Sequence, residues 1–239
     1  MMRLRTGAAA AAAAAALFAV AGCTEQTTGT GGPEGTTGGS AALAAAESLP
    51  VKGRAPKTGY DRDRFGSPWA DTDSNSCDTR DDILKRDLDD AEFSDGSCKV
   101  ASGTLDPDPY TGKDVTFVRG RSQVDIDHVV ALSDAWQKGA QQWDPSKRIA
   151  FANDPLNLIA VDASTNRAKG DGDTATWLPP NRSYRCVYVA AQVAVKKKYG
   201  LWVTSAEKSA MTRVLSDCPG QRLPTGGNPT QAPPRFHAD

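Results

Sequence analysis

One histidine, one acid and one amide within residues 125–170 have the side chains that phosphodiester hydrolysis requires. Asp127 and His128 end an alternating apolar and polar run, and Asn166 follows in a later polar segment. A histidine has a pKa near neutrality, so it can take a proton from water. A hard divalent cation such as Mg²⁺ prefers oxygen ligands, keeps several waters and needs only one or two protein groups. The pattern therefore predicts a metal site with Asp127 and Asn166 as ligands and His128 as general base.

Two predicted strands and a short predicted helix would position these side chains. The alternation over Gln123–Asp127 indicates a strand, and the apolar run Leu156–Val161 indicates a second, buried strand. A short helix should follow, with Ser164 as its N-cap and with Asn166 and Lys169 on one face. Neighbouring residues of a strand point to opposite faces. The acid and the histidine can therefore share a site only if the first strand ends or bends there.

Further elements complete the predicted frame. We expect the strand Val115–Val118 to pair with Gln123–Asp127, directly before a helix. The periodicity and the capping residues predict four longer helices, over Asp78–Phe93, Val129–Gly139, Arg182–Tyr199 with Gly200 as the stop, and from the capping box at Thr204 to Ser216.

The site residues resemble a known family. The Asp-His pair, the later Asn and the Asn-x-x-Lys pattern are similar to the HNH endonucleases, and the nearest patterns are those of CRISPR effectors and of the C-terminal domain of GmrSD restriction endonucleases. The resemblance implies an α+β fold with a ββα-metal (HNH) motif in a mostly helical frame. It makes His128 the general base and Asp127 and Asn166 metal ligands. It also implies that Asn157 holds the loop and the histidine, and that Lys169 lies near the scissile phosphate.

The identity of the third motif residue bears on the metal. Asn166 stands where the older HNH signature has a histidine, which favours Mg²⁺ or Mn²⁺ over the histidine-rich zinc sites of colicin-type nucleases. Each residue also has a simpler interpretation. Asn157 could end a turn, Asn166 could cap a helix, and His128 could be an ordinary satisfied side chain. The joint spacing of these residues favours the HNH interpretation.

The N-terminus has the pattern of an export signal. Residues 1–22 contain two arginines followed by a long alanine run, which is too short and too weakly apolar for a convincing membrane span. The sequence Val20-Ala21-Gly22-Cys23 resembles a bacterial lipobox, which predicts lipidation of Cys23 and attachment to the extracellular face of the cell membrane. An ordinary secretory signal is the alternative, although it would leave a free thiol.

Composition divides the rest of the chain. Residues 23–59 are rich in Gly, Thr and Ala and are predicted to be a disordered tether, and residues 219–239 are predicted to be a disordered tail. The remaining residues 60–218 form the expected HNH endonuclease-like domain.

Four cysteines in this domain fit an oxidising compartment and two disulfides. Four cysteines allow three pairings. Cys77 and Cys98 flank the first predicted helix, and Cys186 and Cys218 would lie at one end of the last two helices if these pack antiparallel. We therefore predict the pairs Cys77–Cys98 and Cys186–Cys218.

Charge gives a weaker signal for the partner. The formal net charge is −1, so there is no global attraction to nucleic acid, but residues 121–200 are mildly basic. This half supplies the candidate phosphate contacts Arg148, Arg167, Arg182, Lys196 and Lys197. A solvated helix face is the alternative for the lysines.

The sequence as a whole predicts an exported, monomeric, metal-dependent endonuclease that acts on DNA more readily than on RNA. A phosphodiesterase for RNA or other diesters and a non-catalytic cell-surface binding lipoprotein remain alternatives.

Overall fold

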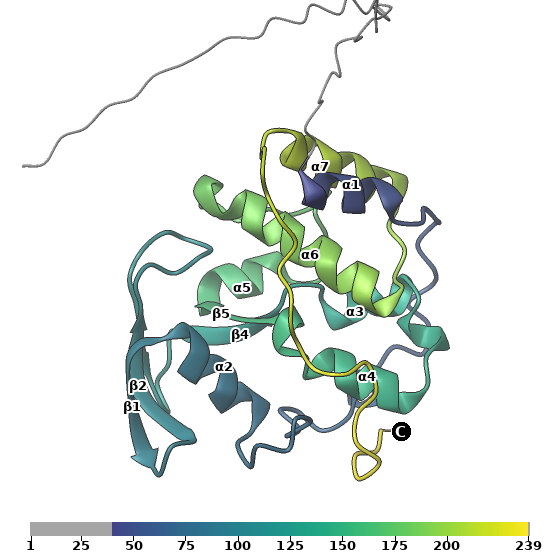
Figure 1. Cartoon of the computed structure of the whole chain (residues 1–239). Helices are drawn as coiled ribbons and strands as arrows, with labels where there is room; N and C mark the ends of the chain where they lie inside the picture. Colours follow the sequence, from purple (N-terminus) through teal and green to yellow (C-terminus); the bar gives the residue numbers. More distant parts are fainter. Residues whose placement is uncertain (1–39, 239) are drawn as a thin grey trace, which may run out of the picture. The chain divides into compact units, whose positions relative to one another are not determined.

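A computed structural model describes residues 40–238, so the predicted leader, the predicted lipidation site Cys23 and the start of the predicted tether lie outside the described residues. Among the helices within that range, none is long and apolar enough to cross a membrane. The elements are shown in Figure 1 and run, in chain order, α1 (Ala41–Ser48), η1 (Arg62–Phe65), α2 (Thr79–Asp87), β1 (Asp89–Asp95), β2 (Lys99–Leu105), β3 (Val115–Val118), β4 (Val124–His128), α3 (Leu132–Gln137), η2 (Ala140–Gln142), α4 (Pro145–Ala152), η3 (Pro155–Asn157), β5 (Leu158–Asp162), α5 (Ala163–Lys169), η4 (Arg182–Tyr184), α6 (Arg185–Tyr199) and α7 (Ser205–Ser216).

The strands form two antiparallel sheets, one in the order β1-β2-β3 and one of β4 and β5. The predicted pairing of Val115–Val118 with Gln123–Asp127 is wrong. β3 pairs with β2, from Ser102↔Val118 to Leu105↔Val115. β4 pairs with β5, so that Asp127 lies opposite Ile159 and His128 opposite Leu158. The mixed α+β class is as predicted.

The predicted helix over Asp78–Phe93 is correct only in its first part. Asp78 caps α2 by accepting a hydrogen bond from the Asp81 backbone N–H, but the helix ends at Asp87. Leu88 turns into the core, and the following acidic segment forms β1 against β2. Pairing with a neighbouring strand therefore overrides the helical pattern here.

The two C-terminal helices agree with the prediction. α6 ends at Tyr199, and Gly200 adopts the left-handed conformation that closes a helix. Thr204 caps α7 by accepting from the backbone N–H of Glu207. The predicted helix over Val129–Gly139 is shorter, because α3 occupies only Leu132–Gln137.

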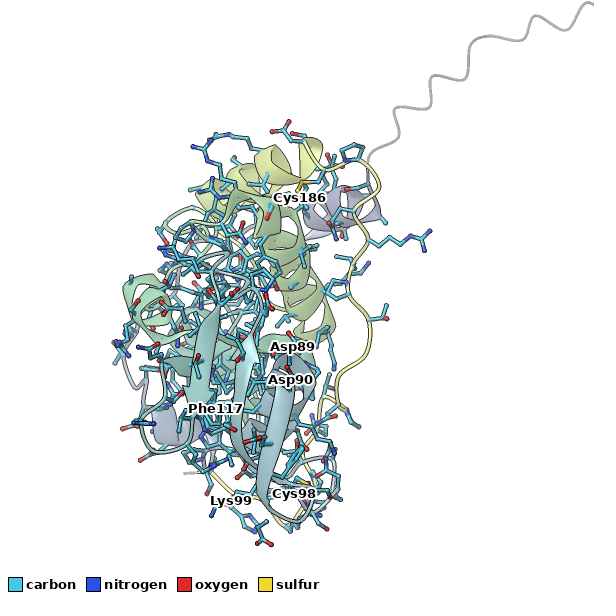
Figure 2. All side chains as sticks on the ribbon, turned by 90° about the vertical axis from the view of Figure 1, so that its left-hand side faces the viewer. Asp89, Asp90, Cys98, Lys99, Phe117 and Cys186 are labelled. Carbon is cyan, nitrogen blue, oxygen red and sulfur yellow. A yellow bond between two sulfur atoms is a disulfide. The ribbon has the colours of Figure 1, made fainter. Side chains whose placement is uncertain are left out.

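Both predicted disulfides are present. Cys77 pairs with Cys98, next to the turn that joins β1 to β2. Cys186 pairs with Cys218 and joins the start of α6 to the residue just after α7. Figure 2 shows Cys98 and Cys186 at opposite ends of the view.

The predicted tether and tail are wrong for the parts that the structure describes. α1 lies within the predicted tether, and its buried residues Ala42, Ala45 and Ala46 pack in one apolar cluster with residues of α6 and α7. The C-terminal segment lacks regular structure but packs along α4, where the Ala232 backbone N–H donates to the Ser146 carbonyl. Figure 1 shows this yellow segment passing α6 and α4. Small apolar residues thus provide contacts that a composition argument overlooks.

A buried ion network joins α3, α6 and α7. The Lys138 ammonium lies 2.6 Å from Asp134, 2.8 Å from Asp173 and 2.6 Å from Glu207. The Lys196 ammonium lies 3.0 Å from Asp134 and 2.9 Å from Glu207. Removal of one partner from such a network strongly destabilises the folded protein, because an uncompensated charge then stays buried. It fixes α3, α6 and α7 relative to one another.

Candidate nuclease site

Three residues predicted from the sequence lie together in one cleft. Asp127 and His128 come from the end of β4, and Asn166 comes from α5, which follows β5 directly. β4 ends at His128, so both of its last side chains can border the same space. The cleft has a volume of about 220 Å³, and its lining consists of these three residues together with Tyr60, Arg62, Ile126, Ala131, Leu132, Gly170 and Asp171.

The position of His128 depends on the end of a helix. Its Nε2 lies 2.9 Å from the carbonyl oxygen of Ala152, the last residue of α4. The last carbonyls of a helix have no partner within the helix. Nε2 therefore carries the proton and donates it, which leaves the lone pair on Nδ1. No group in residues 40–238 hydrogen-bonds to Nδ1.

Electrostatics keep His128 neutral. The side chain is only 8% exposed, and burial lowers its pKa to about 3. The hydrogen bond to Ala152 opposes this change, and the positive charges of Arg62 and Lys169 reinforce it. At neutral pH the imidazole is therefore uncharged, the form that can accept a proton, although its pKa lies below the near-neutral value expected from the sequence and its affinity for a proton is correspondingly lower.

Asp127 is held from two sides. The Tyr110 hydroxyl donates to its Oδ2 at 2.5 Å, and the Lys169 ammonium donates to its Oδ1 at 2.9 Å. Lys169 also donates to the His128 carbonyl oxygen at 2.8 Å. The lysine therefore ties the end of α5 to the end of β4. Its buried amine is engaged by these acceptors rather than free in the cleft, where the family resemblance had placed it near the scissile phosphate.

Asn157 lies outside the cleft and fixes the loop after His128. It is fully buried, and its Oδ1 accepts from the Val130 backbone N–H at 2.9 Å. Its Nδ2 donates to the carbonyls of Val130 at 3.3 Å and Phe151 at 3.4 Å. Asn157 and His128 thus use adjacent carbonyls at the end of α4. Asn157 occupies a position from which it can hold the loop, as expected, but it is a positioning residue.

Asn166 is available as an oxygen donor. It is partly exposed in α5, and its side chain forms no hydrogen bond within the part of the chain that the structure describes. The N-cap of α5 is Asp162 and not Ser164, because the Asp162 carboxylate accepts from the Thr165 backbone N–H. The Ser164 hydroxyl donates to the same carboxylate at 2.5 Å.

This donor set fits a cation that remains largely hydrated. Each carboxylate oxygen can accept more than one contact, so Asp127 retains a lone pair on each oxygen beside its bonds to Tyr110 and Lys169. Residues 40–238 contain no group of three or more His, Cys, Asp or Glu side chains able to hold a metal by themselves. Two oxygen donors suit Mg²⁺, which binds through few protein groups and completes its shell with water and phosphate.

Two of the predicted nucleic-acid contacts are wrong. Arg148 is buried, and its guanidinium donates to the backbone carbonyls of Arg64 and Trp143. Lys196 is fully buried in the ion network. The other three candidates, Arg167, Arg182 and Lys197, are exposed.

Sequence reasoning missed three contributors to the cleft. Tyr110 lies in the loop between β2 and β3, and the Ala152 carbonyl ends a helix that was not predicted. The Asp144-Pro145 pair was a usable signal for that helix, because an Asp N-cap followed by Pro is a typical helix start. Arg62 has no local signal, because only the tertiary fold brings η1 to β4.

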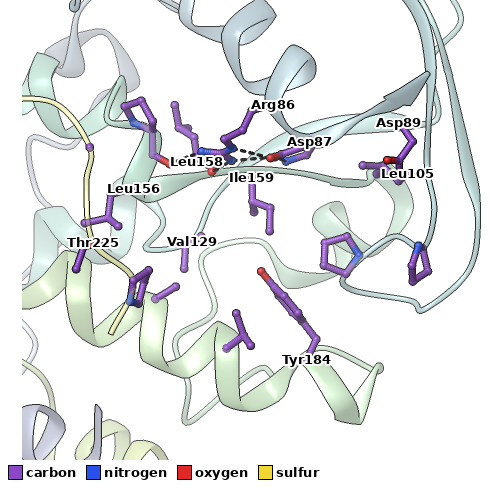
Figure 3. Close-up of a pocket in the computed structure, with 18 of the residues that line it drawn as sticks. Arg86, Asp87, Asp89, Leu105, Val129, Leu156, Leu158, Ile159, Tyr184 and Thr225 are labelled. Atoms are coloured by element: carbon purple, nitrogen blue, oxygen red, sulfur yellow. Dashed lines mark hydrogen bonds and ion pairs between the residues drawn. The ribbon is translucent and has the colours of Figure 1, made fainter. Parts of the chain in front are cut away.

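A larger cleft lies on another part of the surface and contains none of the three candidate residues. Its volume is about 690 Å³, and Arg86, Asp87, Ile159 and Tyr184 are among its lining residues. Figure 3 shows Arg86 paired with Asp87 on one side and the Tyr184 ring on another. The Arg86 guanidinium also donates to the carbonyls of Pro155 and Leu158, so these charges already have structural partners.

Comparison with known proteins identifies a matching domain family and a related protein. Residues 78–214 match the family described as GmrSD restriction endonucleases, C-terminal domain. The chain is also 44% identical over 188 residues to a protein of Arthroderma benhamiae described as an uncharacterized secreted protein, and the match covers 78% of this chain and 89% of that protein. No solved structure matches the chain.

Proposed function

From the fact that this chain belongs to the family of GmrSD restriction endonuclease C-terminal domains, we propose that it is a metal-dependent HNH endonuclease that hydrolyses DNA phosphodiester bonds. The observation that carries the proposal is the meeting of Asp127, His128 and Asn166 in one cleft within the matched residues. β4, β5 and α5 are the proposed ββα motif. The GmrSD family supports a nuclease in general terms, and the cleft supports the assignment of residues.

The proposed chemistry divides between the cation and the protein. A divalent cation, Mg²⁺ or Mn²⁺, would be held by Asp127 and Asn166 and would supply Lewis acidity and charge neutralisation at the phosphate. His128 Nδ1 accepts the proton of the attacking water, because its Nε2–H is engaged by the Ala152 carbonyl. Burial lowers the pKa of His128, so the imidazole is uncharged at neutral pH and its Nδ1 lone pair is open to a proton. Lys169 and Tyr110 orient the Asp127 carboxylate.

We further propose that the chain is exported. The secreted relative, the leader-like residues 1–22 and the two disulfides support this proposal. Lipidation of Cys23 is the more specific part of it. Expression of the full chain with and without Cys23→Ser, followed by mass measurement and fractionation, tests the anchor. An unmodified Cys23 and identical fractionation would reject the anchor without affecting the nuclease proposal.

Incubation of the purified protein with plasmid DNA tests the nuclease proposal. We expect cleavage with Mg²⁺ or Mn²⁺ and none with a chelator. Structured RNA and a small chromogenic diester, tested in parallel, separate a DNA nuclease from a broader phosphodiesterase. Asp127→Asn should weaken Mn²⁺ binding measured by calorimetry, whereas His128→Ala should leave Mn²⁺ binding intact. DNA binding without hydrolysis under every metal would instead support a non-catalytic binding protein.

A further inference from the structure

We propose that Arg62 binds a phosphate of the nucleic acid in the candidate cleft and so completes the site from outside the family-matched residues. The inference rests on the proposed nuclease function. Arg62 is the first residue of η1 and lines the cleft together with Asp127, His128 and Asn166. The family match begins at residue 78, so η1 lies before it.

The short helix that carries Arg62 is firmly anchored. Phe65 is 1% exposed and packs in the core cluster with Leu132, Trp136 and Phe151. Asp61 caps the helix start by accepting from the Asp63 backbone N–H. These contacts fix the backbone, so Arg62 approaches the cleft from a rigid base. A residue on a fixed backbone loses less freedom on binding a ligand than one on a mobile loop.

The helix end adds a second constraint. Gly66 closes η1 with φ 81°, a conformation that favours glycine, and a Cβ at this position would lie 2.6 Å from the Ile149 side chain. α4, which contains Ile149, also supplies the Ala152 carbonyl that holds His128. Arg62 and the proposed base are therefore positioned by the same helix.

The charges in the cleft leave a place for an anion beside Arg62. Asp127 is paired with Lys169, and Asp171 is paired with Lys57 at 2.9 Å. Of the described residues that line the cleft, Arg62 alone is cationic. It is exposed, and its guanidinium forms no ion pair or hydrogen bond with any residue from 40 to 238. An arginine suits phosphate because its donors match two oxygens at once.

The geometry also distinguishes Arg62 from its neighbour Arg64. Arg64 is exposed on the same short helix, but it does not line the cleft, and its guanidinium lies 5.9 Å from the centre of the Trp136 ring. Arg64→Gln removes the same charge from the same element, so it is a matched control for general electrostatic attraction. Arg62→Lys keeps the charge and removes the paired donors.

The experiment measures cleavage of a short labelled duplex with Mg²⁺ by the wild type and by the Arg62→Gln, Arg62→Lys and Arg64→Gln variants. We expect Arg62→Gln to lower kcat/KM by about tenfold or more, Arg62→Lys to be intermediate, and Arg64→Gln to stay within about twofold of the wild type. Thermal unfolding checks that all four proteins are folded. Equal effects of Arg62→Gln and Arg64→Gln would overturn the proposal while leaving the nuclease function in place.

Equilibrium binding in the presence of a chelator provides an arm that does not need turnover. Arg62→Gln should weaken binding of the same duplex and reduce the dependence of log K on log salt by about one unit, whereas Arg64→Gln should not. If the wild type cleaves no substrate, the nuclease function fails, and this arm still decides whether Arg62 binds nucleic acid. Unchanged binding by Arg62→Gln would then overturn this proposal too.

Discussion

Replacement of Tyr110 by Phe isolates the hydrogen bond that holds Asp127. Tyr110 is fully buried, and its hydroxyl donates to the carboxylate at 2.5 Å. Its ring packs edge-on against Trp177 at 5.0 Å and Tyr188 at 5.7 Å, and Phe retains these contacts. A hydrogen bond to a charged group contributes about 1.5–3 kcal/mol net. We therefore expect Tyr110→Phe to lower the free energy of unfolding by that amount, which is about 10- to 150-fold in the unfolding equilibrium.

Urea denaturation of the oxidised protein at neutral pH measures this loss. The midpoint should fall with an unchanged slope, because the surface buried in the folded state is the same. Tyr184→Phe is the matched control. The Tyr184 hydroxyl forms no hydrogen bond within the described range, so its removal should change stability by less than about 0.5 kcal/mol. Equal losses for the two variants would show that the Tyr110 hydroxyl does not support Asp127.

Three further predictions concern the frame of the site. Burial alone would raise the Asp134 pKa, but the neighbouring lysines lower it from 3.8 to about 2. The ionised carboxylate therefore stabilises the folded state fully above pH 3.8, and this stabilisation is lost as the pH falls through 2. Asp134→Asn should flatten the pH dependence of the free energy of unfolding in that window, measured by acid unfolding. Replacement of both Cys186 and Cys218 by Ala opens a 32-residue loop and should cost about 3–4 kcal/mol in guanidinium denaturation, and a loss below about 1 kcal/mol would contradict the stabilising role. Asn157→Ala leaves the buried Val130 N–H without its acceptor and should cost about 1–3 kcal/mol by thermal unfolding, with faster hydrogen exchange at Val130; unchanged exchange there would reject the anchoring role.

The parts of the fold that depend on neighbouring residues could be predicted from the sequence. Gly200 and Thr204 mark helix ends through local backbone chemistry, and both act as expected. The partner of β3 could not be predicted in the same way. Strand pairing depends on segments that the fold brings together. β2, the partner of β3, was not predicted, and it follows the segment that was wrongly predicted to be helical as far as Phe93.

In the candidate site too, some residues could be predicted from the sequence pattern, and others depend on tertiary packing. Asp127, His128 and Asn166 share a sequence pattern, so their meeting in one cleft could be expected from the sequence. Arg62 lines the cleft from a short helix, and Tyr110 contacts Asp127 from a loop, and the placement of both depends on tertiary packing.

The prediction that Lys196 contacts nucleic acid was wrong, although the helical spacing around it indicated that its side chain is buried. Lys196 lies four residues after Gln192 and eight after Tyr188, both of which are buried. Residues at these spacings share one face of a helix. The middle lysine of the triplet, Lys197, points to solvent instead. A run of like charges on an amphipathic helix therefore has to be divided by face before it is assigned to a partner.

Comparison of the wild type with His128→Ala on the same plasmid with Mg²⁺ tests the central claim most directly. General base catalysis contributes about 100-fold or more, so we expect a loss of at least that size in a variant that remains folded at the assay temperature, with Mn²⁺ binding unchanged. Cleavage by the folded His128→Ala protein at the wild-type rate would contradict the role of His128 as the general base.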